Sequence, residues 1–217
     1  MIAHDDILHA ARAHALALSV CTTGATALAA TTTGYTRAAG SFLTDGFRAG
    51  MELVPDGFPQ ATEGVITAVS DLALTIAGGR TVAAEASGRT LTVGMPRDFV
   101  IANAVHTPTT GVPYVNEEYL YGGLTKPGLG AFGALEATPL YLLRFRLPIG
   151  TGPHAASRYA DATIQHFAPG TPLTLANGDV ARVRGDVAPS AGQATPLGDR
   201  FAVLVTIPLR LTTPNSR

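Results

Sequence analysis

Two long stretches of the chain alternate apolar and other residues with a period of two, which is the pattern of a half-buried strand. Apolar side chains fall on one face over residues 200–212, and the same alternation recurs over residues 138–149, where Arg144 and Arg146 take the opposite face. Between these stretches, residues 153–168 carry apolar side chains three to four positions apart, as an amphipathic helix does. We therefore expect two long strands paired in a single layer and covered by the helix between them.

The N-terminal segment has the spacing of a second helix, with Asp5 and Asp6 near its positive end and Gly24 placed to end it. From about Thr22 to Pro96 the sequence changes to threonine, glycine and short alternating runs, which favour small strands joined by tight turns. Strands are expected at residues 26–36, 50–54, 65–69, 72–76 and 90–93. We predict an all-β domain, a small barrel or sandwich, over residues 22–96, inserted into a core formed by residues 1–21 and 97–217.

After the predicted insertion, residues 99–106 and 114–121 are expected to form a hairpin around a turn stiffened by Pro108 and Pro113. Residues 122–139 are rich in glycine, and we expect a long loop without regular structure there. Loops of that length usually carry function or disorder.

The second face of the two long strands is apolar in places, at Leu140, Leu142 and Leu204. A monomer would leave these side chains in water unless another part of the chain covered them. Two interpretations stay open: the inserted domain or a loop covers this face, or the face is a subunit interface.

The amino-acid composition argues against several classes of protein. The 217 residues are 46% hydrophobic, which is ample for a packed core, and only 14% are charged, with a formal net charge of -1. Such a chain has no electrostatic footprint for binding nucleic acid phosphates. The single cysteine, Cys21, forbids an internal disulfide and fits assembly in a reducing cytoplasm. No apolar run reaches the roughly 18 to 20 residues of a membrane span, and the N-terminus lacks the features of a signal peptide, so we expect no membrane association.

One motif imitates a nucleotide site. Residues 128–133 match the glycine pattern that binds pyrophosphate, but that motif must follow a strand and open a helix. Here it follows Lys126-Pro127 and leads into a strand, so we interpret it as a loop.

The remaining polar residues do not form a reactive group. Glu117 and Glu118 are neighbours on a predicted strand, so they point to opposite faces. His4, His9 and His14 are five residues apart, about 140° around a helix, and cannot share a metal-binding face. We expect no catalytic residue, no cofactor and no metal site.

The order of the elements (helix, hairpin, long strand, helix, hairpin-like pair, long strand) resembles the tail terminator family of long-tailed bacteriophages, also called tail completion or head-tail joining proteins. The resemblance covers residues 1–21 and about 97–217. The residues that carry it are 107–115 (Thr-Pro-Thr-Thr-Gly-Val-Pro-Tyr-Val), 141–150 leading into Gly152-Pro153 and Ala160-Asp161, 167–171, and 201–211. The predicted insertion is absent from minimal members of that family and looks like a small β-domain that recurs in phage tail and virion proteins.

The resemblance implies an α+β fold, a mixed or antiparallel sheet with two helices on one face, and assembly as a homo-oligomer, expected to be a hexameric ring. Such a ring stops polymerisation of the tail tube at its head-proximal end and binds the tube protein and the head-side connector or stopper. DNA passes through it without specific binding. The implied location is the virion tail or neck, with the host cytoplasm as the site of assembly.

Within that interpretation, the wall of a DNA channel should avoid strong positive charge, because phosphate contacts would slow transit. The predicted lumen-facing residues are Glu117, Glu118 and Glu136. The predicted subunit or partner contacts are Leu140, Leu142, Leu204, Tyr114, Leu124 and Lys126. Two alternatives remain: a head-completion or stopper protein of the neck, and a tail decoration whose β-domain binds glycans or a receptor.

Overall fold

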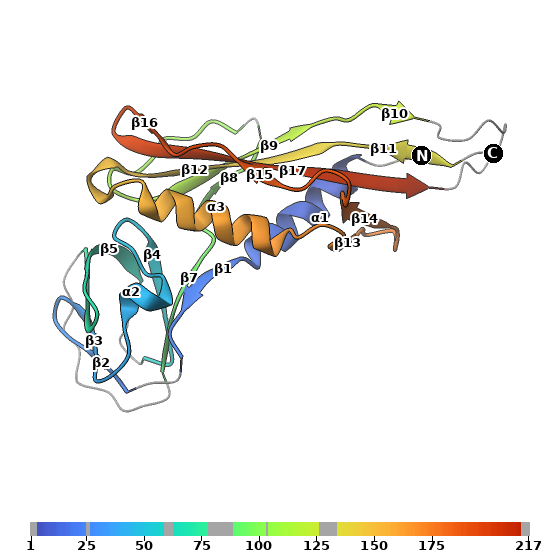
Figure 1. Cartoon of the computed structure of the whole chain (residues 1–217). Coiled ribbons are helices and arrows are strands. Elements are labelled where there is room, and N and C mark those ends of the chain that lie inside the picture. Colours follow the sequence, from blue (N-terminus) through green and yellow to red (C-terminus); the bar gives the residue numbers. More distant parts are fainter. Residues whose placement is uncertain are drawn as a thin grey trace.

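The computed structural model describes residues 4–24, 27–58, 63–77, 89–102, 104–125 and 134–213. Its described strands form two sheets, of seven and ten strands, with two longer helices and a short one, so the fold is α+β. The ten-stranded sheet and its helices lie in one layered body, and the seven-stranded sheet lies at one end on the helical side (Figure 1). The segment that forms the seven-stranded sheet therefore does not cover the opposite face of the large sheet.

The two long alternating stretches pair as predicted. β12 (Leu140–Pro148) runs antiparallel to β17 (Arg200–Thr213), with Leu143 opposite Val205 and Phe145 opposite Val203. α3 (His154–His166) packs against both strands, and the Tyr159 ring stacks on Phe145 with the ring centroids 5.2 Å apart. A 3₁₀ turn (Ile149–Thr151) joins β12 to α3. The apolar period of two thus becomes the buried face of the sheet.

The rest of the large sheet extends these two strands. The order is β10-β11-β17-β12-β9-β8, and β13, β14, β15 and β16 join at the outer edge of β17. The bounds are β8 (Asp98–Val100), β9 (Tyr114–Leu120), β10 (Leu124–Thr125), β11 (Leu135–Ala137), β13 (Pro172–Thr174), β14 (Val180–Val183), β15 (Ser190–Ala191) and β16 (Thr195–Leu197).

Two predictions about this sheet were wrong. β8 and β9 pair in parallel, with Phe99 opposite Val115, so they are not arms of a hairpin. The connection between them is long enough to return the chain to the same end of the sheet. The two prolines in it had led us to predict a tight turn. Residues 122–139 contain β10 and β11, which complete the sheet beside β17 instead of forming a loop.

The N-terminal helix is shorter than predicted. α1 (His4–Leu16) ends eight residues before Gly24, and β1 (Ser19–Thr22) follows it. The Leu18 amide donates to the carbonyl of Ala15, which closes the last turn, and β1 then pairs with β7 (Thr90–Gly94). The end of α1 is therefore set by the pairing of β1 with β7, which is distant in the sequence. The spacing of apolar residues within the helix could not predict this pairing.

The seven-stranded sheet has the order β1-β7-β4-β5-β6-β3-β2. Its other strands are β2 (Leu28–Ala30), β3 (Gly34–Arg37), β4 (Glu52–Asp56), β5 (Gly64–Val69) and β6 (Ala73–Ile76), close to the predicted positions except that residues 26–36 hold a hairpin. α2 (Phe42–Asp45) is capped by Ser41 and ends at Gly46, which has a φ of 101°. Because β1 belongs to this sheet, the segment that forms it begins at Ser19.

Candidate assembly surface

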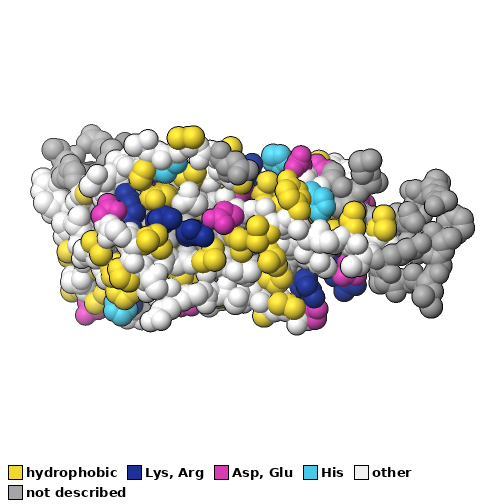
Figure 2. Space-filling model, turned by 90° about the horizontal axis from the view of Figure 1, so that it is seen from above, with side chains coloured by type: hydrophobic (Ala, Val, Ile, Leu, Met, Phe, Trp, Pro, Cys, Tyr) yellow, Lys and Arg dark blue, Asp and Glu magenta, His cyan; other side chains and the backbone are white. Residues whose placement is uncertain are grey.

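One face of the large sheet points away from the helices. Residues directly opposite each other in antiparallel strands share a face, and the register puts the even-numbered positions of β9, β12 and β17 on the side opposite the packed core of Leu143, Phe145 and Val205. Figure 2 looks onto this side and shows hydrophobic side chains among a few arginines and carboxylates. We call this side the free face, and its central residues are Glu118, Leu120, Leu140, Leu142, Arg144 and Leu204.

The apolar residues of the free face differ in how far the chain itself covers them. Leu120 is 52% exposed, and Leu140 and Leu204 are partly exposed. Leu142, by contrast, is only 7% exposed. Leu140 and Leu204 therefore remain available to a partner, and Leu142 contributes little contact area.

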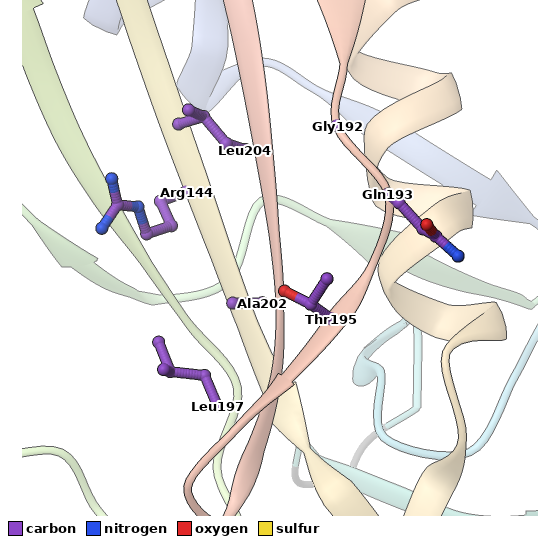
Figure 3. A pocket seen from close by; sticks show the side chains of 7 residues that line it. All are labelled: Arg144, Gly192, Gln193, Thr195, Leu197, Ala202 and Leu204. Atoms are coloured by element: carbon purple, nitrogen blue, oxygen red, sulfur yellow. The ribbon is translucent and has the colours of Figure 1, made fainter.

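A shallow depression of about 230 Å³ lies on the free face beside Leu204. It is lined by Arg144, Gly192, Gln193, Thr195, Leu197, Ala202 and Leu204. Figure 3 shows that Arg144, Leu197 and Leu204 project to the same side of β17, whereas Gln193 projects toward α3. Its lining is one guanidinium among apolar and small side chains, which suits a protein contact better than a reaction.

Beyond the helices, β10, β11 and the end of β17 form a three-stranded arm (Figure 1). Leu124 on β10 is 57% exposed and Tyr121, just before it, is 67% exposed. Of the two contact residues predicted here, Leu124 has an accessible side chain, and Lys126 lies outside the described residues, as does the glycine motif of residues 128–133.

A bulge connects β9 to the arm. Leu120 pairs with Leu140 and Leu124 pairs with Ala137, so the three residues 121–123 face the two residues 138–139. A Cβ on Gly122 would lie 2.0 Å from the Thr138 carbonyl oxygen. The close approach of the two backbones therefore requires glycine at this position.

Glu117 was predicted to face a lumen, and this is wrong. Its side chain is buried on the helical face, where Arg12 of α1 donates to both carboxylate oxygens at 2.6 and 2.8 Å. The Tyr141 hydroxyl donates to the same carboxylate at 3.2 Å. Burial raises the pKa of Tyr141, and the adjacent Glu117 charge raises it further. This carboxylate holds α1 on the sheet and is out of reach of any channel.

Of the other two predicted lumen residues, Glu118 lies at the surface, whereas the Glu136 side chain is only 15% exposed. Glu118 points to the free face, opposite to Glu117 as strand alternation predicted, and pairs with Arg144 at 3.2 Å. Glu136 on the arm pairs with Arg210 at 2.9 Å. Each carboxylate is thus balanced by an arginine of the neighbouring strand.

Tyr114, a predicted contact residue, is buried by its own chain. It is 7% exposed, with the Arg200 guanidinium 4.8 Å from its ring centroid. Arg200 in turn donates to the carbonyls of Val112 and Thr109 at 2.6 and 2.8 Å. The segment before β9 is therefore fastened over this end of the free face, and the prediction for Tyr114 was wrong.

Two features escaped sequence reasoning. The rings of His14 and His166 stack with centroids 4.0 Å apart, and each Nε2 donates to the backbone carbonyl of the other residue, at 3.0 and 2.8 Å. Arg182 and Arg210 are direct cross-strand neighbours on β14 and β17. Both pairs join residues far apart in sequence, so no local signal reports them.

Two observations concern metal binding and thiol reactivity in the described parts of the chain. No group of three His, Cys, Asp or Glu side chains there could hold a metal ion. Burial raises the pKa of the Cys21 thiol to about 12, which keeps it protonated and unreactive. In the same residues, none of the helices is long and apolar enough to cross a bilayer.

Comparison with known proteins identifies the family. A family model described as phage tail terminator protein matches residues 81–209. A solved structure is 18% identical, with 54% of this chain and 79% of that chain covered and a TM-score of 0.43. No curated protein matches. Tail terminators are structural components of the virion tail and not enzymes. Since the match spans more than half of the chain, this protein belongs to the phage tail terminator family.

Proposed function

We propose that the chain forms a homo-oligomeric ring, expected to be hexameric, at the head-proximal end of the tail tube. There it stops polymerisation of the tube and joins the tail to the head-side connector or stopper. The family match over residues 81–209 carries this proposal. The free face and the arm support it, because a ring needs surfaces that a single copy leaves uncovered.

The domain organisation is part of the proposal. Residues 1–21 and 97–217 form the core that assembles, and residues 22–96, whose sheet also includes β1, form an inserted domain on the outside of the ring. The position of the seven-stranded sheet at one end of the molecule, on the helical side, agrees with an outer decoration (Figure 1). The ring assembles in the host cytoplasm, has no enzymatic activity and needs no cofactor.

For the channel, we propose Glu118 and Glu136 as lumen residues, now without Glu117. Their ion pairs with Arg144 and Arg210 leave a nearly neutral surface, along which DNA passes without specific binding. Charge reversal of both carboxylates to lysine should slow DNA ejection while rings still form.

The test is removal of the chain from an infection. If the chain is a terminator, its loss should give tails of uncontrolled length that do not join heads, and purified chain added to tubes in vitro should cap one end and halt growth. Tubes of normal length that fail to join heads would instead identify a stopper on the head side. Tube length measured by negative-stain microscopy therefore separates the two neck functions.

A further inference from the structure

The arm leaves strand edges unpaired on both of its sides. On one side, β8 pairs with β9 only at residues 114–116, so within the described residues the edge from Glu117 through β10 has no further strand partner. On the other side, β14 pairs with β17 only at Leu209 and Arg210, so among the residues that the structure describes no strand pairs with this edge of β17 beyond Arg210. Unpaired edges are templates for strand addition from another chain.

The strand directions permit the two edges to meet between copies. β9 is antiparallel to β12, and β12 is antiparallel to β17, so β9 and β17 run in the same direction. β10 and β17 likewise both run antiparallel to β11. A copy placed beside another by rotation about an axis along the strands would therefore add β10 parallel to the neighbour's β17.

The two edges also differ in charge. Asp5 of α1 is next to His4, whose ring contacts Tyr119 and Tyr121 at the β9 edge, whereas Glu118 is already paired with Arg144. The β17 edge carries Arg182 opposite Arg210, a like-charge pair that is unfavourable by itself. Among the described carboxylates none lies within ion-pair distance of Arg182, whose guanidinium donates only to the Gly170 carbonyl at 3.3 Å.

A pocket lies where the second edge opens. β14 and β17 pair at two positions among the described residues, and a cavity of about 390 Å³ beside them is lined by Val180 and Arg182 of β14 and by Arg210 and Thr212 of β17. It gives space beside the unpaired β17 edge for side chains of an incoming strand, and a carboxylate placed there would offset the charge of Arg182, since Arg210 is already paired with Glu136.

We propose that the occupant is a second copy of this chain, whose β9–β10 edge adds in parallel to the β17 edge, so that the arms form one continuous sheet around the ring. This inference rests on the proposed function for the closure of the ring. The contact is heterologous, since the β9–β10 edge of one copy meets a different edge, that of β17, in the next. Pairing of β10 with itself would be antiparallel and would leave the β17 edge of both copies open.

Cysteine crosslinking tests this pairing. Thr125 on β10 and Thr212 on β17 are exposed and lie in one row across the arm, Thr125 opposite Glu136 and Glu136 opposite Thr212, so Thr125→Cys and Thr212→Cys place thiols on one side of the sheet. Both are made in a Cys21→Ala background. The two single variants are mixed at high concentration under mild oxidation and analysed on a non-reducing gel.

We expect a disulfide-linked dimer from the mixture, little from either variant alone, and a ladder of higher species from the double variant. A matched control replaces Thr212→Cys with Ser157→Cys, an exposed position on α3, and should give no product. Dimers from Thr125→Cys alone, or no product in the mixture, would overturn the proposal.

A second measurement separates this inference from the function. Arg182→Glu should reduce self-association by at least tenfold in analytical ultracentrifugation, and added salt should weaken association of the parent chain. If rings still cap tail tubes while the mixed disulfide is absent, the terminator function stands and this interface is wrong. If the mixed disulfide forms but removal of the chain from an infection leaves tube length unaffected, the interface stands and the terminator function is wrong.

Discussion

Arg12 and Glu117, 105 positions apart in the sequence, form a bidentate ion pair beneath the large sheet, with Nη2 and Nε of the arginine 2.6 and 2.8 Å from the two carboxylate oxygens. The carboxylate is fully buried and the guanidinium is one fifth exposed. This pair, together with Tyr141, fixes the position of α1 on β9 and β12.

Replacing Arg12 by methionine should destabilise the chain strongly. The substitution leaves Glu117 buried without its counter-charge, and the expected loss in unfolding free energy is about 3–5 kcal/mol. Urea denaturation followed by circular dichroism measures it. The exposed pair of Glu118 and Arg144 provides the control, since Arg144→Met should cost no more than about 1 kcal/mol. Equal losses at the two sites would contradict the buried role of Glu117.

The stacked histidines predict a loss of stability at mildly acidic pH. Burial lowers the pKa of His14 in the folded chain, so the unfolded chain binds the proton more readily. Its contribution is fully present above the ordinary histidine pKa of about 6.5 and decreases as the pH falls below that value.

Denaturation at pH 7.5 and 5.5 checks this, compared between the parent chain and His14→Gln. The variant should be less sensitive to pH over this range. His9→Gln, an exposed substitution on the same helix, should behave as the parent chain does. Unchanged pH sensitivity in His14→Gln would exclude His14 as the source.

Alanine at Gly122 should disturb the arm. Its Cβ would overlap the Thr138 carbonyl, so the bulge must open, at an expected cost of about 1–3 kcal/mol. Hydrogen exchange should show faster exchange of the β10 and β11 amides while β12 stays protected. Gly123→Ala is the matched control, because no heavy atom lies within 4 Å of a Cβ there. Similar exchange in the two variants would argue against the bulge.

Gly50, just before the small-sheet strand β4, lies close to the turn that precedes α3. It has a φ of 89°, and a Cβ would lie 2.5 Å from the Thr151 hydroxyl oxygen in the turn before α3. Gly178 has a φ of 87° with open space around it, so Gly178→Ala measures the backbone strain alone, about 1–2 kcal/mol. Gly50→Ala should cost more than this. Thermal unfolding of both variants gives the comparison, and equal costs would show that Thr151 moves freely.

Much of the fold could be predicted because its signals are local. The alternation in β12 and β17 and the spacing in α3 are properties of neighbouring residues, and hydrophobic burial then determines which face of each element turns inward. The same alternation correctly separated Glu117 from Glu118 and exposed Leu140 and Leu204 as apolar residues outside the core.

The features that only the tertiary structure decided are contacts between residues distant in the sequence. Residues 19–22 form β1 instead of continuing the predicted helix, because they pair with β7. β8 and β9 are parallel because the chain between them returns to the same end of the sheet. A carboxylate is expected in solvent unless a counter-charge is brought to it, and Arg12 reaches Glu117 only in the folded chain. Local sequence sets the period and the inward face of each element, whereas strand partners and the burial of a charge are properties of contacts that form only once the chain has folded.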